Sequence, residues 1–418
     1  MSYESWGRWI PSTPARVVHN LRDTTDLVLP YGLGRSYGDS CLNNGHALLD
    51  TRELDHFRAF DDATGVLDCE GGMTLAEILR VFVPRGWFLP VTPGTKFVTV
   101  GGCIANDVHG KNHHRAGTFG RHVRSLELVR SDGSRTRCAP GDPMFAATIG
   151  GLGLTGLIAS AEIQLRRIES AEITVERVPF RSLDEFEALS KACDATHEYT
   201  VAWFDSFSGA KGIFFQGNHA PLTLPARQPR GEGARRLPIL PVLNQLTVRA
   251  FNTAYFVANA RPKPQRVHWN PFFYPLDAVA NWNAIYGRNG FLQYQFVIPE
   301  IAGLDPVKEI VNGAARSKLA SFLTVIKKFG ALSSPGLLSF PRAGTTVCFD
   351  FAARGLETLL PMLERFDDVV EAAGGRVYPA KDARMSGPRF RRFFPQWEEL
   401  RKYADPQFSS SFWRRVMS

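Results

Sequence analysis

Small and ionisable residues crowd into one short stretch of this chain, residues 99–114, with almost no bulky apolar side chain among them. Its glycines allow the backbone to approach a flat or charged ligand closely, because no Cβ atom stands in the way and the N–H groups are free to donate. His109 and Lys111 bring ionisable groups to the same place. The stretch predicts a ligand-binding segment; a glycine-rich turn with solvated basic residues is the alternative.

Two further glycine clusters support a ligand-binding role. Residues 27–39 form an apolar, strand-like run that opens into a loop with three glycines. Backbone amides in such a loop can hold a pyrophosphate, and Arg35 adds a planar fork of donors, although a tight hairpin would show the same composition. The spacing is neither that of the dinucleotide-binding fingerprint nor that of a P-loop. With the third cluster, at residues 149–158, the pattern predicts one large ligand held along its length.

Two glutamines offer hydrogen bonds of another kind. Gln293 and Gln295 alternate with aromatic residues in a strand-like run, so both amides should face the same side. Two amides on one face suit a polyol, and an exposed edge strand with polar side chains is the alternative. Cys348 lies in an apolar strand pattern, where a lone cysteine is more often packing than chemistry.

The elements that must position these groups are mixed helices and strands. Thr74 and Glu77 form a capping-box pattern that predicts a helix ending near Pro84. A second helix is predicted from Leu356 to a stop at Gly374. The expected strands are residues 66–70, 124–130, 159–165, 173–178, 201–204 and 376–378, and the entry at residues 14–29 looks short for a strand, helix and strand.

Proline and arginine gather between residues 221 and 241, which predicts a loop rather than a core element. It is either a solvated excursion or a mobile lid that meets anionic lipid head groups. The expected organisation is a first domain at 1–168, a second at 169–375 with its mobile loop near 221–245, and a C-terminal segment at 376–418 that returns to the first domain.

Composition limits the functional classes. The 418 residues, 44% of them hydrophobic, can bury a large core, and no run of about 18 apolar residues predicts a membrane span. The six cysteines show no metal-ligand spacing, and the N-terminus lacks the order of a signal peptide, so we expect no metal site and a cytoplasmic protein. The formal charge of +8 favours anionic substrates or lipid surfaces. Nucleic-acid binding is disfavoured because the basic residues are not interleaved with aromatic ones.

The motifs together resemble a known family. The Gly-Leu-Gly-Arg-Ser-Tyr-Gly-Asp run at 32–39, Pro93-Gly94-Thr95, the 99–114 stretch and Gly-Leu-Thr-Gly at 153–156 resemble the FAD-binding domain of the vanillyl-alcohol-oxidase flavoproteins. Within that superfamily, residues 109–114, 202–205, 291–296 and 378–382 resemble the decaprenylphosphoryl-β-D-ribose 2'-oxidase family. The resemblance implies an α+β fold, with a PCMH-type two-part FAD-binding domain and a substrate (cap) domain built on an antiparallel sheet.

The resemblance also implies roles for individual residues. Lys381 and His109 would be catalytic; Lys381 would act as a base or as a charge stabiliser, and His109 would act in the chemistry or only position the flavin ring. The FAD contacts would be Gly32, Leu33, Gly34, Arg35, Ser36, Tyr37, Gly38, Asp39, Gly94, Thr99, Val100, Gly101, Gly102, His109, Gly110, Ile158 and Tyr378. The substrate contacts would be Lys111, Trp203, Gln293, Gln295, Lys327 and Cys348.

The sequence departs from the family pattern at three places. Many relatives in the superfamily attach flavin covalently to a histidine in the first glycine loop, but this chain reads Gly34-Arg35-Ser36 there, so we expect noncovalent FAD. Thr346 stands where the family usually has Asn, and Phe273 where it has Tyr, which affects the details of substrate contact.

The function implied is oxidation of a secondary hydroxyl of a polyprenyl-phosphate pentose to a keto sugar, the first half of an epimerisation to the arabinose form. A partner NAD(P)H-dependent keto-sugar reductase would complete it, and the enzyme could contact the inner face of the membrane peripherally. The alternatives are a soluble sugar or alditol oxidase that uses oxygen, and a basic lipid- or nucleic-acid-binding protein without turnover.

Overall fold

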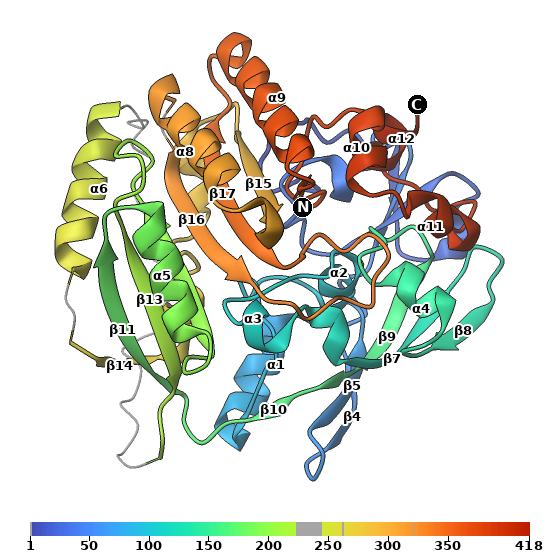
Figure 1. The fold of residues 1–418 in the computed structure, drawn as a ribbon. Helices are drawn as coiled ribbons and strands as arrows, with labels where there is room; N and C mark the ends of the chain where they lie inside the picture. The colour runs from blue at the N-terminus through green and yellow to red at the C-terminus, as the bar shows by residue number, and fades with distance from the viewer. Residues whose placement is uncertain (1, 223–244, 261–262, 320) are drawn as a thin grey trace.

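The computed structural model describes residues 2–222, 245–260, 263–319 and 321–418. Residues 223–244 of the predicted loop therefore lie outside the described residues. The described residues form helices and four sheets (Figure 1), which confirms the predicted α+β class. Among the described residues, no helix is both long enough and apolar enough to cross a bilayer.

A small parallel sheet opens the fold, in the order β1 (Arg16–Val18), β3 (Ala47–Asp50), β2 (Val28–Tyr31). Between β1 and β2 the chain makes only a 3-10 turn at Leu21–Asp23. The predicted shortening of this entry is therefore confirmed, because a single 3-10 turn replaces the helix of a full crossover.

A five-stranded antiparallel sheet follows, and it carries the glycine-rich segments. Its order is β4 (Phe57–Asp61), β5 (Val66–Glu70), β9 (Leu157–Gln164), β7 (Val123–Val129), β8 (Arg135–Cys138). Helix α1 (Leu75–Phe82) begins as predicted, since Thr74 Oγ1 accepts a hydrogen bond of 3.1 Å from the Glu77 N–H. Apolar residues of α1 and of α2 (Val100–Ala105) pack with this sheet in one buried cluster.

The largest sheet has eight antiparallel strands. Their order is β14 (Gln265–His268), β11 (Glu172–Phe180), β13 (Gly212–His219), β12 (Tyr199–Phe204), β16 (Ser321–Phe329), β17 (Gly344–Ala352), β15 (Phe291–Pro299), β18 (Arg376–Val377). Helices α5 (Leu183–Cys193), α8 (Asp305–Ser317) and α9 (Leu356–Ala372) cover one face over a large apolar core (Figure 1). The opposite face is left to the functional site.

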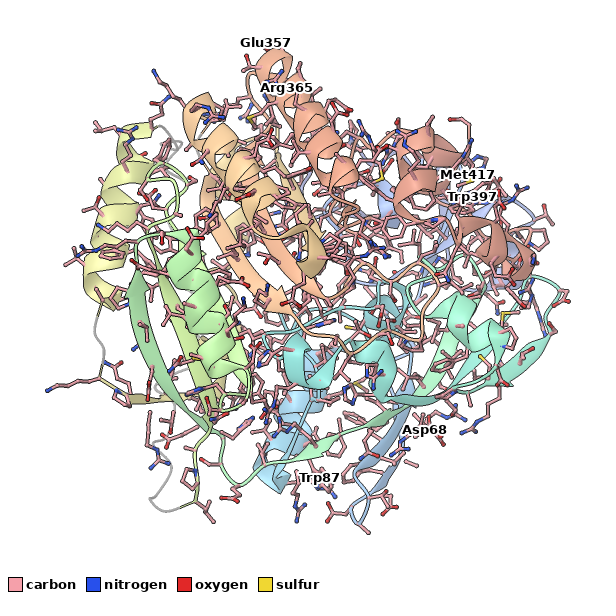
Figure 2. The ribbon with its side chains drawn as sticks, viewed as in Figure 1. Asp68, Trp87, Glu357, Arg365, Trp397 and Met417 are labelled. Atoms are coloured by element: carbon pink, nitrogen blue, oxygen red, sulfur yellow. The ribbon has the colours of Figure 1, made fainter. Side chains whose placement is uncertain are left out.

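Further helices complete the fold. They are α3 (His113–Ala116), α4 (Pro143–Thr148), α6 (Gln245–Asn259), α7 (Trp269–Phe273), α10 (Gly387–Phe393), α11 (Trp397–Tyr403) and α12 (Ser411–Met417), and β6 (Trp87–Phe88) pairs with β10 (Arg166–Arg167). Figure 2 marks the extremes, with Glu357 and Arg365 of α9 on one side of the molecule and Asp68 and Trp87 on the other.

The C-terminal segment closes on the beginning of the chain. Phe408 bridges Val28 of β2, and the Arg415 guanidinium donates to both carboxylate oxygens of Asp39 at 2.7 and 2.8 Å and to Asp382 at 3.0 Å. Arg415 thus ties the first glycine loop to the loop that carries Lys381. The domain boundaries given above stay predictions.

Candidate functional site

A large cavity lies between the glycine loops and the open face of the eight-stranded sheet. Its volume is about 1380 Å³, which exceeds the roughly 300–1000 Å³ of an ordinary small-molecule site. Such a space can hold two ligands side by side. One wall is mainly backbone of the glycine loops, and the other is formed by side chains of β11 to β17.

The glycine wall is shaped so that backbone faces the cavity. A Cβ atom on Gly32 would lie 2.5 Å from Thr99 Oγ1, and one on Gly34, whose φ is +60°, would lie 2.1 Å from the Tyr31 hydroxyl. Thr99 is itself fixed, because its Oγ1 accepts from the Gly102 N–H at 3.2 Å. At Gly94 a Cβ would meet no heavy atom within 4 Å. Gly32 and Gly34 are thus required by close packing against Thr99 and Tyr31, whereas Gly94 leaves open space beside the main chain, where an extended ligand such as FAD can lie.

The predicted cofactor contacts divide into two groups. Three of them, Gly38, Asp39 and Val100, do not line the cavity; Asp39 is instead occupied by Arg415, and Val100 is fully buried in the core. The others do line it: Gly32, Leu33, Gly34, Arg35, Ser36, Tyr37, Gly94, Thr99, Gly101, Gly102, His109, Gly110, Ile158 and Tyr378.

Arg35 is less free than the sequence suggested. Its guanidinium carbon lies 4.1 Å above the Trp6 ring, and its Nε donates to the Phe97 carbonyl at 3.0 Å. The stacking orients the guanidinium at the edge of the cavity.

His109 is held on both ring nitrogens. Lys327 Nζ donates to Nδ1 at 2.7 Å and to the Gly110 carbonyl at 2.9 Å, while the Gln295 amide lies 3.0 Å from Nε2. Burial, with the nearby Lys327 charge second, keeps the pKa of His109 well below its ordinary value. The imidazole is therefore neutral and positioned, with neither nitrogen free for a substrate proton.

Lys381 is placed differently. It follows β18, and its Nζ lies 3.6 Å from the centre of the Tyr37 ring. Among the described residues its amine has no hydrogen-bond partner. Burial lowers the pKa of Lys381, an effect that Cys348 and Asp350 oppose. A buried amine with a lowered pKa and no hydrogen-bond partner among the described residues is suited to accept a proton.

Asp350 is a site residue that the sequence reasoning missed. It is fully buried on β17, where Gln293 Nε2 donates to Oδ1 at 2.5 Å and the Tyr286 hydroxyl donates to Oδ2 at 3.3 Å. Burial raises the pKa of Asp350, whereas Gln293 and the Lys381 charge lower it. The sequence contained a signal for Asp350. In an extended strand, side chains two positions apart face the same side, so Asp350 must face the side that Thr346 and Cys348 face.

Two further lysines form a cationic pair. Lys111 Nζ donates to the Phe273 carbonyl at 3.0 Å, and burial lowers its pKa to about 8. Burial and then the charge of Lys111 lower the pKa of Lys327 to about 7. Because the two ammonium groups repel each other, an anion between them would stabilise both.

All six predicted substrate residues line the cavity: Lys111, Trp203, Gln293, Gln295, Lys327 and Cys348. Gln293 and Gln295 lie on β15 between two partners, β17 and β18, so the edge-strand alternative is wrong. Burial raises the pKa of Cys348, so this side chain is a thiol. Thr346 and Phe273, where the chain departs from the family pattern, also line the cavity.

A smaller hollow of about 390 Å³ lies among the C-terminal helices and is lined by Trp397 and Met417. Figure 2 labels these two side chains. Arg391 and Arg401 pack on the Trp397 ring at 5.4 and 5.6 Å. The described residues hold no group of three or more histidine, cysteine or acidic side chains that could bind a metal ion.

The comparisons with known proteins agree with this geometry. Residues 11–139 match the FAD binding domain family, so the glycine-lined wall and the sequence define an FAD-binding protein. The chain is 37% identical to decaprenylphosphoryl-β-D-ribose oxidase of Mycolicibacterium smegmatis, over 98% of this chain and 96% of that protein. It therefore belongs to the decaprenylphosphoryl-β-D-ribose oxidase family, which confirms the resemblance inferred from the motifs.

Two other known proteins are similar to this chain at lower identity. An uncharacterised protein of Streptomyces coelicolor is 33% identical over 82% of this chain and 100% of its own length. Alditol oxidase of a Streptomyces species is 23% identical over 83% of this chain and 80% of its own.

Proposed function

We propose that this protein is an FAD-dependent oxidoreductase that oxidises a secondary hydroxyl of a polyprenyl-phosphate pentose to a keto sugar, the first half of an epimerisation to the arabinose form. The observation that carries the proposal is the second wall of the cavity. There the Lys381 amine, the Gln293 and Gln295 amides and the Lys327 ammonium face the glycine loops, and Lys111 extends toward them from the glycine wall.

FAD would lie noncovalently along the glycine wall, because no histidine occurs in the first glycine loop at 32–39. Bound there, it supplies the acceptor for the hydride that leaves the carbinol carbon. The glycines hold the ligand close to main chain, and Tyr378, whose hydroxyl donates to the Asn106 carbonyl at 2.9 Å, fixes the wall beside His109.

Lys381 takes the hydroxyl proton as the hydride departs. Its Nζ is uncommitted, whereas both nitrogens of His109 are engaged, so His109 acts as a positioning residue for Lys327 and Gln295. Asp350 then stabilises the ammonium that forms on Lys381, since the two groups attract each other.

The remaining side chains read the substrate. Gln293 and Gln295 bind sugar hydroxyls, and Lys111 and Lys327 bind the phosphate as point charges. Trp203 and Cys348 border the same space. This division explains why both charged and neutral polar groups face one cavity.

The product is a ketone, so a reductase that uses NAD(P)H must follow to complete the inversion. We place the enzyme at the cytoplasmic face of the membrane, because its substrate carries a lipid. Helix α6 supports this contact: Leu246 and Val257 are 78% and 68% exposed on it.

An alditol oxidase that uses oxygen is the second candidate, favoured by the relative of that name. The buried lysines Lys111 and Lys327 disfavour the alditol oxidase, because a free alditol has no anionic group that these two cations could bind.

The test is the absorption spectrum of the purified protein under anaerobic conditions. We expect a yellow protein whose flavin band bleaches on adding a polyprenyl-phosphate ribose and does not bleach with a free alditol. Bleaching by the alditol alone would favour the second candidate.

A further inference from the structure

The open face of the eight-stranded sheet changes character from one side to the other. Strands β15, β16 and β17 present polar and ionisable groups to the cavity, among them Gln293, Lys327 and Asp350. Strands β11, β12 and β13 present mainly apolar groups, among them Val175, Val201 and Phe215. The strand order places these two sets on opposite halves of one continuous surface.

The cationic pair lies at the boundary between the halves. The register pairs Trp203 with Val325 and Ala202 with Ile326, which sets Val201 of the apolar half directly beside Lys327. Lys111 extends from the opposite wall, where the rings of Phe272 and Phe273 lie 5.8 and 5.7 Å from its Nζ. Along the cavity the order is therefore polar groups, two cations, apolar groups.

Helix α6 partly covers the apolar half. Tyr255 of α6 lies 4.7 Å from Trp203 between ring centres, and Phe251, 40% exposed, stacks on Tyr255 at 5.8 Å. Arg177 is a charged residue in this apolar half. Its guanidinium donates to the Gln265 side chain at 2.6 Å and lies beside the Phe215 ring. The result is an apolar corridor that continues from the cations toward the outer surface of α6.

We propose that this corridor, formed by Val175, Val201, Trp203, Phe215 and Tyr255, binds the first isoprene units of the substrate's lipid tail. The proposal rests on the proposed function and extends it. A phosphate held by Lys111 and Lys327 would direct the sugar toward Lys381 and the tail over β12 and β13. The apolar side chains that line the corridor gain by being removed from water when an alkyl chain covers them.

The test compares two compounds with the same phosphoribose head, one a methyl ester without a tail and one carrying a farnesyl tail. In the wild-type protein we expect the farnesyl compound to reduce the flavin with a kcat/KM at least tenfold higher. Trp203→Ala and Phe215→Ala should each reduce that preference by about tenfold, and in Phe215→Ala the kcat for the methyl compound should stay within about twofold. Ile301→Ala is the matched control, because Ile301 is 97% exposed and does not line the cavity.

Binding gives a readout independent of turnover. Titration calorimetry with farnesyl phosphate and methyl phosphate should show that Trp203→Ala and Phe215→Ala also lose the preference for the tail in binding affinity. Trp203→Phe should keep most of that preference. Retention of the full preference in both alanine variants would overturn the corridor. Failure of both compounds to reduce the wild-type flavin would overturn the proposed function itself, so the two failures are distinguishable.

Discussion

Replacing Lys381 with methionine removes the amine and keeps the length of the side chain. The substitution should leave FAD bound, because the glycine wall does not depend on Lys381, and should lower the rate of flavin reduction by roughly 100- to 10,000-fold. That range corresponds to about 2.7 to 5.4 kcal/mol of lost transition-state stabilisation. The large effect is expected because the neighbouring groups are otherwise engaged: His109 is committed to Lys327 and Gln295, and Cys348 is a thiol with a raised pKa. The Asp350 carboxylate already accepts hydrogen bonds from Gln293 and Tyr286.

The fold should tolerate the change. Lys381 Nζ rests on the face of the Tyr37 ring at 3.6 Å, a contact that a thioether can replace. Burial of an ammonium is also unfavourable, so a neutral side chain at this position removes a desolvation cost. Thermal unfolding should therefore show no loss of stability.

The assay is anaerobic stopped-flow measurement of flavin bleaching at saturating substrate, with flavin content and circular dichroism measured in parallel. Lys402→Met, which removes an exposed lysine on α11 whose side chain is 67% accessible, is the matched control. Reduction of the Lys381→Met flavin at the wild-type rate would refute the assignment of the base. Loss of bound FAD would show instead that Lys381 holds the cofactor.

Three further predictions follow from the same cavity. Acid or heat should release intact FAD into the supernatant, because no histidine lies in the first glycine loop; flavin that stays with the precipitate would contradict noncovalent attachment. Lys111→Met and Lys327→Met should each weaken binding of the phosphorylated substrate about tenfold or more, judged from KM, and reduce its sensitivity to salt; an unchanged KM would exclude the phosphate site. The pH profile should show kcat rising with pH as Lys381, whose pKa is lowered, loses its proton, while substrate affinity falls as Lys327 and Lys111 lose theirs from pKa values of about 7 and 8; a kcat that falls across the same range would contradict the role of Lys381 as base.

Many helix boundaries and strands could be predicted from local sequence patterns. The helix start at Thr74, the stop at Gly374 and the strand alternations depend on residues a few positions apart, and the structure confirms each of them. The capping box itself is half formed, because the Glu77 carboxylate accepts from Arg80. The glycine loops were readable for the same reason, since a backbone that must face a ligand tolerates no Cβ. Local patterns could not predict which motif residues fail to line the cavity. These residues are Gly38, Asp39 and Val100, which stand inside the glycine motifs but are absent from the cavity lining.

The sequence by itself determined which groups are available: three glycine loops, a glutamine pair, and lysines at 111, 327 and 381. Only the tertiary structure decided which of them share one cavity, because these groups come from different strands and loops whose pairing no local pattern specifies. His109 contacts both Lys327 and Gln295, and Asp350 and Lys381 line the same cavity, so in the proposed function His109 positions Lys327 and Gln295, and Asp350 stabilises Lys381. The division of the sheet into a polar and an apolar half likewise follows from strand order, which long-range packing fixes.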